Sequence, residues 1–220
     1  MTPLSAGQLL HAYSMGIFPM ARERRDPDLY WVDPDSRGIV PLDGFHVPRS
    51  LKKTIRRKKF AVTCDKAFLP IMRLCAAPAP DRPESWINGT IVALFTELHY
   101  QGHAHSIEVW LGGVLVGGLY GLALGGAFFG ESMASRATDA SKVALVHLVA
   151  HLKAGSYSLL DTQFLTEHLS RFGAIDIPRA DYHARLARAL RTPAVFSDIM
   201  AEDPLSVLAE PSGPRFSSAG

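Results

Sequence analysis

One short segment pairs a carboxylate with an amide and could orient or deprotonate an amine. In LLDTQ (159–163), Asp161 and Gln163 are two residues apart, so a strand places both side chains on one side. Apolar neighbours partly desolvate a carboxylate, which favours a proton acceptor or an orienting charge. The alternative is that Asp161 caps the next helix while Gln163 faces solvent, and spacing alone favours this alternative.

A second polar segment, GESMASR (130–136), lies between an apolar run and a helix start at Asp139 or Ser141. The free N–H groups at such a helix start can bind an anion or orient a reacting group, although an ordinary cap is the simpler alternative. Ser132 loosely resembles the serine of a nucleophile elbow. The last glycine of that motif is missing and no His–Asp pair is evident, so a hydrolase triad is not favoured.

The histidines do not form a metal-binding pattern. His147 and His151 are four residues apart, and His99, His103 and His105 are close in the chain, but no Cys or Glu completes a zinc motif. No G-x-x-x-x-G-K loop is found either. We therefore predict no metal ion, and no bound ATP or dinucleotide.

Residues 49–59, here called the basic segment, hold seven cations and no acidic residue. A helix that starts near Pro48 places Leu51 and Ile55 on one face and cations on another. A solvated face is the common alternative, but such faces usually mix both signs, whereas this set matches a phosphate-backbone footprint. We expect a polyanion to contact these side chains: Arg49, Lys52, Lys53, Arg56, Arg57, Lys58 and Lys59.

The overall charge hides this segment. Among the 220 residues, 23 Lys and Arg stand against 21 Asp and Glu. Taken whole, this net charge of +2 argues against a dedicated nucleic-acid-binding protein, and no DNA partner is expected. Outside the basic segment, 16 basic residues remain against 21 acidic ones. With 47% hydrophobic and 20% charged residues, the chain is expected to fold as one large domain or as one domain with a small partner.

The sequence predicts a cytoplasmic protein without a membrane partner. The two cysteines are too few for a disulfide framework, and the N-terminus carries no secretory signal. Residues 109–130 form a run of 22 residues without a charge, long enough to cross a bilayer. Eight of them are glycine, which disfavours a helix, so buried strands joined by turns explain the run better.

Hydrophobic periodicity predicts an α+β fold. Two Gly-Gly turns join three apolar runs into an antiparallel meander over 104–111, 114–123 and 127–133. In the turn-rich passage 24–44, only residues 30–32 are expected to form a strand. We further expect strands at 60–63 and 158–162, and helices near 9–15 and 48–57 and over 66–75, 88–101, 142–154, 164–172 and 181–191.

Four strings together resemble the bacterial leucyl/phenylalanyl-tRNA–protein transferases, in order from about residue 9 to 190. They are LLHAYSMGIFPM, WVDPDSRGIVPL with HVPRSLKKTIRRKKF, the long run GHAHSIEVW through GESMASR to DASKVAL, and LLDTQFLTEHLSRFGAIDIPR. A segment G-L-L-A-x-G-G-D-L, common near the start of family members, is not found. The resemblance implies a small N-terminal domain (1–36), a domain with the fold of acetyl-CoA-dependent N-acetyltransferases (GNAT-like, 37–200) and a tail (201–220) that we expect to be disordered.

The resemblance also implies a reaction. Family members transfer leucine or phenylalanine, and methionine less well, from aminoacyl-tRNA to the α-amine of proteins that begin with Arg or Lys, which marks these for N-degron proteolysis. The donor is an activated ester, so no cofactor is implied. Two alternatives stay open: a non-catalytic RNA-binding module, and a coenzyme A-dependent N-acetyltransferase. The stretch SRATDASK lacks the glycines of a pyrophosphate loop, which favours aminoacyl-tRNA over acetyl-CoA.

By similarity to the family, residue roles follow. Asp161 orients or deprotonates the amine, Gln163 hydrogen-bonds the reacting groups, and Glu131 holds the cationic acceptor residue. The basic segment is implied to bind the tRNA. The pocket for the aminoacyl side chain is expected to include Trp86, Phe128, Met133 and Ser135.

Overall fold

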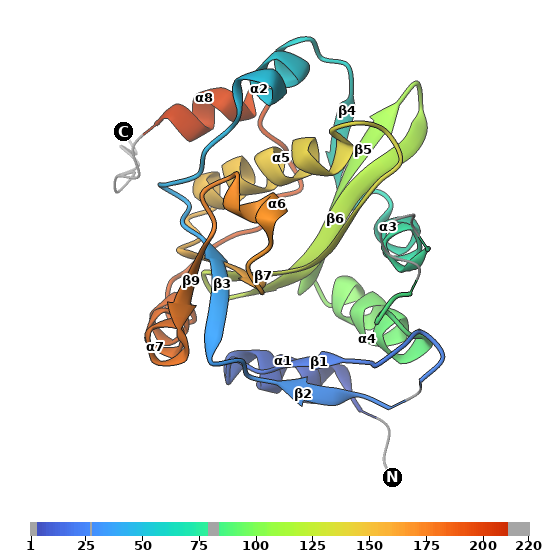
Figure 1. The fold of residues 1–220 in the computed structure, drawn as a ribbon, viewed down its shortest axis with the longest axis vertical. Helices are drawn as coiled ribbons and strands as arrows, with labels where there is room; N and C mark the ends of the chain where they lie inside the picture. Colours follow the sequence, from blue (N-terminus) through green and yellow to red (C-terminus); the bar gives the residue numbers. More distant parts are fainter. Residues whose placement is uncertain (1–3, 27, 79–83, 211–220) are drawn as a thin grey trace, which may run out of the picture.

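The computed structural model describes residues 4–26, 28–78 and 84–210 (Figure 1). Its elements follow one another as α1 (Ala6–Ser14), β1 (Phe18–Met20), β2 (Tyr30–Val32), β3 (Ser36–Val40), α2 (Arg49–Arg56), β4 (Ala61–Cys64), α3 (Phe68–Ala76), α4 (Gly89–Tyr100), β5 (Ala104–Leu111), β6 (Val114–Leu124), β7 (Ala127–Ser135), α5 (Ala140–Ala154), β8 (Leu159–Gln163), α6 (Glu167–Ser170), β9 (Ile175–Pro178), α7 (Arg179–Ala189) and α8 (Pro204–Ala209).

A seven-stranded sheet in the order β4-β5-β6-β7-β8-β3-β9 forms the centre of the fold. All neighbouring strands in it run antiparallel except β7 and β8, which are parallel. The predicted meander is confirmed as β5, β6 and β7, with tight turns at Gly112-Gly113 and Gly125-Gly126. The α+β fold class predicted from the sequence is therefore correct.

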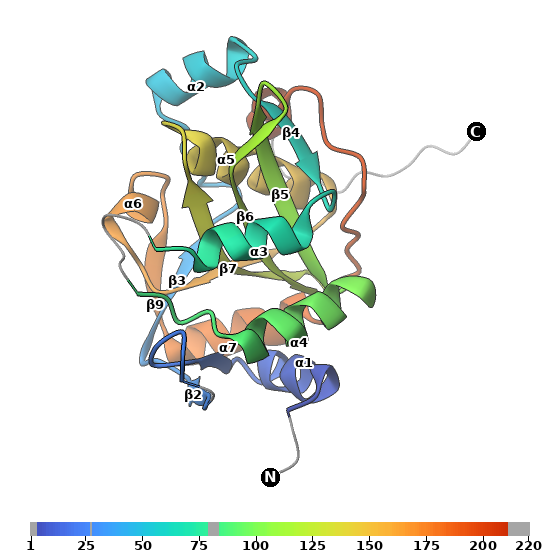
Figure 2. The same ribbon diagram turned by 90° about the vertical axis from the view of Figure 1, so that its right-hand side faces the viewer.

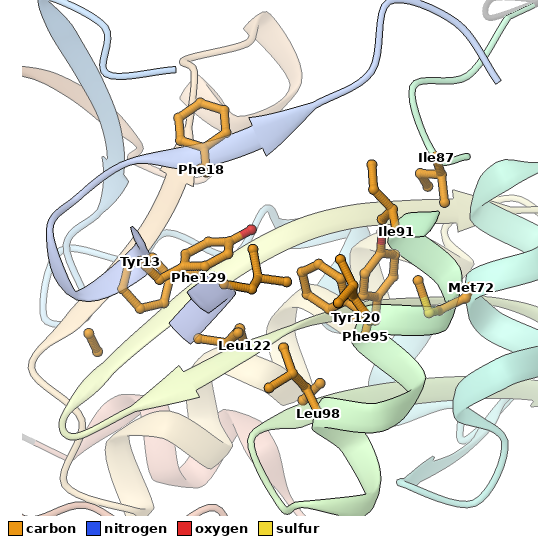
Figure 3. Close-up of a cluster of buried hydrophobic side chains, with 14 of the residues drawn as sticks. Tyr13, Phe18, Met72, Ile87, Ile91, Phe95, Leu98, Tyr120, Leu122 and Phe129 are labelled. Atoms are coloured by element: carbon orange, nitrogen blue, oxygen red, sulfur yellow. The ribbon is translucent and has the colours of Figure 1, made fainter. Parts of the chain in front are cut away.

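Helices cover both faces of this sheet (Figures 1 and 2). The buried hydrophobic side chains therefore form two clusters. One cluster joins α1, α3, α4 and α7 to the sheet, and Figure 3 shows Tyr13 of α1 beside Phe129 of β7 in it. The other cluster lies under α5, whose buried face includes Leu145, Leu148 and Leu152. Because Leu9, Tyr13 and Phe18 belong to the first cluster, the N-terminal residues pack directly on the sheet.

Three strands, β1, β3 and β9, escaped prediction. The turn-rich passage holds not only β2 but also β3, which lies between β8 and β9 in the sheet. The predicted helix over 164–172 is wrong in extent, because only α6 is helical there and β9 follows it. β3 is short and pairs with residues at least 120 positions away in the chain, so no local period marks it.

The expected disordered tail is wrong for residues 204–209, which form α8. Asp203 accepts a hydrogen bond from the Leu205 N–H at 3.0 Å, Pro204 begins the helix, and α8 packs on α5. Residues 211–220 lie outside the described part of the chain. Among the described residues, every helix is too short or too polar to cross a bilayer.

Candidate active site

A cavity of about 320 Å³, here called the central pocket, opens where β7 and β8 diverge. The two strands pair over only three positions, ending at Phe129 opposite Asp161. The residues that follow on both strands, Gly130 to Met133 and Thr162 to Gln163, line the pocket. Most of the remaining wall is apolar and includes Met20, Trp86, Leu119, Leu145, Leu148 and Phe164.

A β-bulge presents Glu131 to this pocket. On β6, Gly121 pairs with Gly130 and Tyr120 with Ser132, so Glu131 is the additional residue on β7. A bulge redirects side chains and reverses the alternation of the strand beyond it. A side chain on Gly121 would meet the Phe129 carbonyl oxygen at 2.3 Å, so the close approach of β6 and β7 at the bulge requires glycine there.

The carboxylate of Glu131 has one satisfied and one unsatisfied oxygen. Tyr13 Oη donates to Oε1 at 2.7 Å, and Gln163 Nε2 donates to the same atom at 3.0 Å. Oε2 is buried and has no hydrogen-bond partner among the described residues. The pKa of Glu131 is raised to about 8, chiefly by burial and also by the nearby Asp161 charge, while the Tyr13 and Gln163 donors and the Arg37 charge oppose this shift in part.

Asp161 is fully buried and surrounded by donors. Arg37 donates from Nε to Oδ1 at 2.9 Å and from Nη2 to Oδ2 at 2.7 Å. Tyr182 Oη donates to Oδ2 and the Gln163 backbone N–H donates to Oδ1, both at 2.7 Å. Both oxygens are therefore occupied, and the bidentate ion pair fixes the carboxylate.

The guanidinium of Arg37 is itself enclosed. It lies 4.5 Å from the Phe18 ring centroid and 4.4 Å from that of Tyr182, and its Nη1 donates to the Gly16 carbonyl at 2.9 Å. These contacts join the turn after α1, β1, β3 and α7 to Asp161 on β8. The Arg37–Asp161 pair thus connects the N-terminal residues to the centre of the sheet.

The structure decides between the two interpretations of LLDTQ. Asp161 does not cap the following helix, because Thr166 is the N-cap of α6 and accepts from the Leu169 N–H at 3.2 Å. Gln163 is only 7% exposed and adopts a positive φ of 64°, which turns the chain at the end of β8. The capping alternative is therefore wrong, and both side chains lie in one buried cluster with Glu131.

The four residues expected around the aminoacyl side chain separate into two pairs. Trp86 and Met133 line the central pocket. Phe128 is absent from its wall, because it faces α5 and stacks with Phe196 at 5.6 Å between ring centroids. Ser135 lies beyond the pocket at the end of β7, where its hydroxyl donates to the Ala137 carbonyl at 2.8 Å.

Sequence reasoning missed Tyr13, Arg37 and Tyr182, which hold the two carboxylates. Tyr13 lies on the helix predicted near 9–15, and Arg37 lies in the turn-rich passage, for which only one strand is predicted. Each of these side chains is at least 21 residues away in the sequence from the carboxylate that it hydrogen-bonds, and Arg37 is 124 residues away from Asp161. Spacing along the chain therefore carries no signal for these contacts.

The basic segment forms α2 and the residues that follow it. Leu51 is buried against the α5 side of the core, while Arg49, Lys53, Arg56 and the three cations that follow it are exposed. Lys58 and Lys59 lie beyond the helix end. Within the described parts of the chain, the seven cations form no ion pair. Figures 1 and 2 place α2 at the opposite end of the molecule from α1 and β2.

The histidines do not gather into a metal site. In the part of the chain that the structure describes, no group of three or more His, Cys, Asp or Glu side chains could hold a metal ion. His147 lies on α5, and burial lowers its pKa to about 4. The Asp139 backbone precedes α5, but its side chain does not cap the helix and instead pairs with Lys142 at 2.8 Å.

The raised pKa of Glu131 predicts a pH-dependent cost in stability. Its pKa rises from 4.5 to about 8 on folding, so the folded state favours the neutral acid, and stability is lost as the pH rises between these values. Glu131→Gln removes this titration. Compared with the wild type in urea unfolding, the variant is expected to gain a few kcal/mol between about pH 5 and about pH 8. A difference that stays constant with pH would contradict the assignment.

Two family models match the chain. The model described as leucyl/phenylalanyl-tRNA protein transferase covers residues 39–187, and that of its N-terminal domain covers residues 2–35. The crystal structure of FemX superposes with a TM-score of 0.50 at 11% identity, over 77% of this chain and 66% of that one. The FemX similarity shows a shared fold and nothing further.

Curated relatives agree with the family models. The leucyl/phenylalanyl-tRNA–protein transferase of Paramagnetospirillum magneticum is 61% identical over 89% of this chain and 94% of its own length. That of Rhodospirillum rubrum is 56% identical over 93% and 96%, and that of Maricaulis maris is 56% identical over 92% and 94%. The chain belongs to the leucyl/phenylalanyl-tRNA–protein transferase family.

Proposed function

We propose that the protein transfers leucine or phenylalanine, and methionine less efficiently, from aminoacyl-tRNA to the N-terminal α-amine of cytoplasmic proteins that begin with Arg or Lys, marking them for N-degron proteolysis. The observation that carries this proposal is the central pocket. In a chain of this family, it combines an apolar wall with two buried polar side chains, Glu131 and Gln163. The apolar wall suits an aminoacyl side chain, and the polar side chains suit an amine.

The apolar part of the pocket receives the donor side chain. Trp86, Met133 and Leu145 offer apolar contact to an unbranched or aromatic side chain. β-Branched Ile and Val would place a methyl group next to the ester, where they clash. Discrimination by one methyl group is worth about 1–3 kcal/mol, so some transfer of methionine is expected.

The polar part of the pocket receives the acceptor. Gln163 donates a hydrogen bond to Glu131 and approaches the reacting groups. In its ionised form, Glu131 supplies negative charge for an N-terminal residue that carries an ammonium and a basic side chain. The carboxylate oxygens of Asp161 already accept hydrogen bonds from Arg37 and Tyr182, which supports a role for Asp161 as an orienting charge. Aminolysis of an ester needs the amine held against the carbonyl carbon, and the donor brings its own activation.

The basic segment is proposed as the tRNA contact. Its exposed cations form no ion pair in the described structure, which leaves them free to contact phosphates. The parallel pair β7–β8, which separates after three positions, supports a GNAT-like arrangement of the larger domain. The two family models meet between residues 35 and 39, which supports a division into residues 1–36 and 37–200.

One assay tests this function. The protein is incubated with leucyl-tRNA labelled in the leucine and with matched peptides that begin with Lys, Arg or Ala. Label is expected in the Lys and Arg peptides only. Absence of label with every peptide would overturn the proposal, label from acetyl-CoA would show an N-acetyltransferase, and tRNA binding without transfer would show an RNA-binding module.

A further inference from the structure

The proposed reaction needs a group that removes a proton from the acceptor's α-ammonium, and Asp161 is poorly placed to do so. Its two oxygens already accept hydrogen bonds from Arg37, Tyr182 and the Gln163 N–H, and the carboxylate is 0% exposed. A substrate amine would have to displace one of these donors. Asp161 also does not line the central pocket.

Glu131 has the features that Asp161 lacks. It lines the central pocket, it is 8% exposed, and its Oε2 has no hydrogen-bond partner among the described residues. Buried carboxylate oxygens are nearly always satisfied, so an unsatisfied one in a pocket points to a ligand that supplies the donor. Tyr13 and Gln163 hold Oε1, so the side chain stays fixed, while the buried Oε2 keeps its capacity to accept a hydrogen bond unused.

We propose that Glu131 is the proton acceptor of the transfer, with Oε2 binding the acceptor's α-ammonium and taking one proton from it. This inference rests on the proposed function and names the group that performs its first step. Asp161 and Arg37 then act as positioning residues, because they fix the Gln163 turn through the backbone N–H bond to Oδ1. Tyr13 positions Glu131 directly.

The proton and electron balance is complete without a further reactant. The α-ammonium gives one proton to Oε2, and the nitrogen lone pair forms a bond to the ester carbonyl carbon. The bond from that carbon to the ribose oxygen breaks, and the second proton of the attacking nitrogen goes to this oxygen. The products are the peptide bond and a free ribose hydroxyl, and Glu131 returns its proton to solvent.

Other titratable groups surround Glu131, and none replaces it. Tyr13 of α1 and Tyr182 of α7 are phenols whose pKa burial raises, so they stay protonated near neutral pH. Arg37 of β3 is a cation, and Tyr120 of β6 is another buried phenol. His168 of α6 lines the pocket, but burial lowers its pKa and it brings no negative charge to bind an ammonium.

The pKa of Glu131, raised by burial to about 8, supports this role. A protein α-amino group has a pKa of about 7.7–8.0, so the two groups exchange a proton at little cost. The productive pair consists of an ionised Glu131 and a protonated amine. Ionised Glu131 forms as the pH rises toward about 8, and the protonated amine is lost as the pH rises beyond it. The kcat/KM for the acceptor should therefore pass through a maximum near that pH.

The test is the pH profile of kcat/KM for a Lys-starting peptide in wild type, Glu131→Gln, Glu131→Asp and His168→Gln. Initial rates are corrected for ester hydrolysis in parallel reactions without peptide. The wild type is expected to give a bell-shaped profile. Glu131→Gln should lose about 10²–10⁴-fold in kcat/KM and rise steadily with pH, because it must use the free amine. Glu131→Asp should keep the bell shape at a lower rate, and His168→Gln should also keep it.

Three results would overturn the inference. The first is a Glu131→Gln profile with the same shape as the wild type, and the second is a bell shape lost in His168→Gln but kept in Glu131→Gln. The third is a wild type whose rate rises monotonically. All three require an active wild type, so they differ from failure of the proposed function, in which the wild type transfers no label. Unfolding curves of each variant identify a loss that comes from misfolding.

Discussion

Asp161→Ala is expected to lower the free energy of unfolding by about 3–5 kcal/mol, because it leaves the Arg37 guanidinium buried without a counter-charge. Arg37 is 1% exposed and makes a bidentate pair with Asp161. The same change releases the Gln163 turn, so transfer of leucine should fall much further than binding of leucyl-tRNA. Urea unfolding and a single-turnover transfer assay measure the two effects separately.

A double variant separates the stability effect from the activity effect. Arg37→Met with Asp161→Leu replaces the buried pair by apolar side chains of similar size, which often restores or raises stability. We expect it to be more stable than Asp161→Ala while transfer stays low. Recovery of transfer together with stability would show that Asp161 only maintains the fold. Equal stability of Asp161→Ala and wild type would show that the buried pair is not needed for folding.

The elements that the sequence predicts well are those whose signals are local. The Gly-Gly turns and apolar runs predict β5, β6 and β7, and the helical period predicts α4 and α5 close to their observed ends. β3 and β9 have no such signal, because their pairing depends on strands distant in the chain. α8 was likewise not predicted, because its six residues are stabilised by packing on α5, which is distant in the sequence.

The candidate site shows the same limit at the level of single residues. Residue type marks Asp161 and Gln163 as candidates, but spacing alone favours a cap, and it is the family resemblance that assigns them to the site. In the structure, Gln163 bonds both Asp161 and Glu131. Phe128 does not line the pocket as expected, because one residue along a strand decides which face a side chain takes. Phe128 faces α5, and Phe129 faces Tyr13 with ring centroids 5.0 Å apart. Only the register of the sheet fixes this.

Arg56→Ala with Arg57→Ala is expected to weaken tRNA binding and flatten its salt dependence. Each lost phosphate contact makes the negative slope of log K against log salt less steep by about 0.7–0.9. Loss of both contacts should therefore make it less steep by about 1.5. Alanine suits the last turn of α2, so the helix should remain folded. Filter binding of leucyl-tRNA at several salt concentrations measures the slope.

The matched control is Arg185→Ala with Arg188→Ala, which removes the same charge from exposed positions of α7. Figures 1 and 2 place α7 far from α2, toward the end that holds α1. If α2 contacts the tRNA backbone, this control keeps the wild-type slope. Equal losses in the two variants would show that net charge alone attracts the tRNA. A weaker salt dependence in the α7 variant alone would place the tRNA at the opposite end of the molecule. The cations of α2, which form no ion pair in the described structure, argue against this placement.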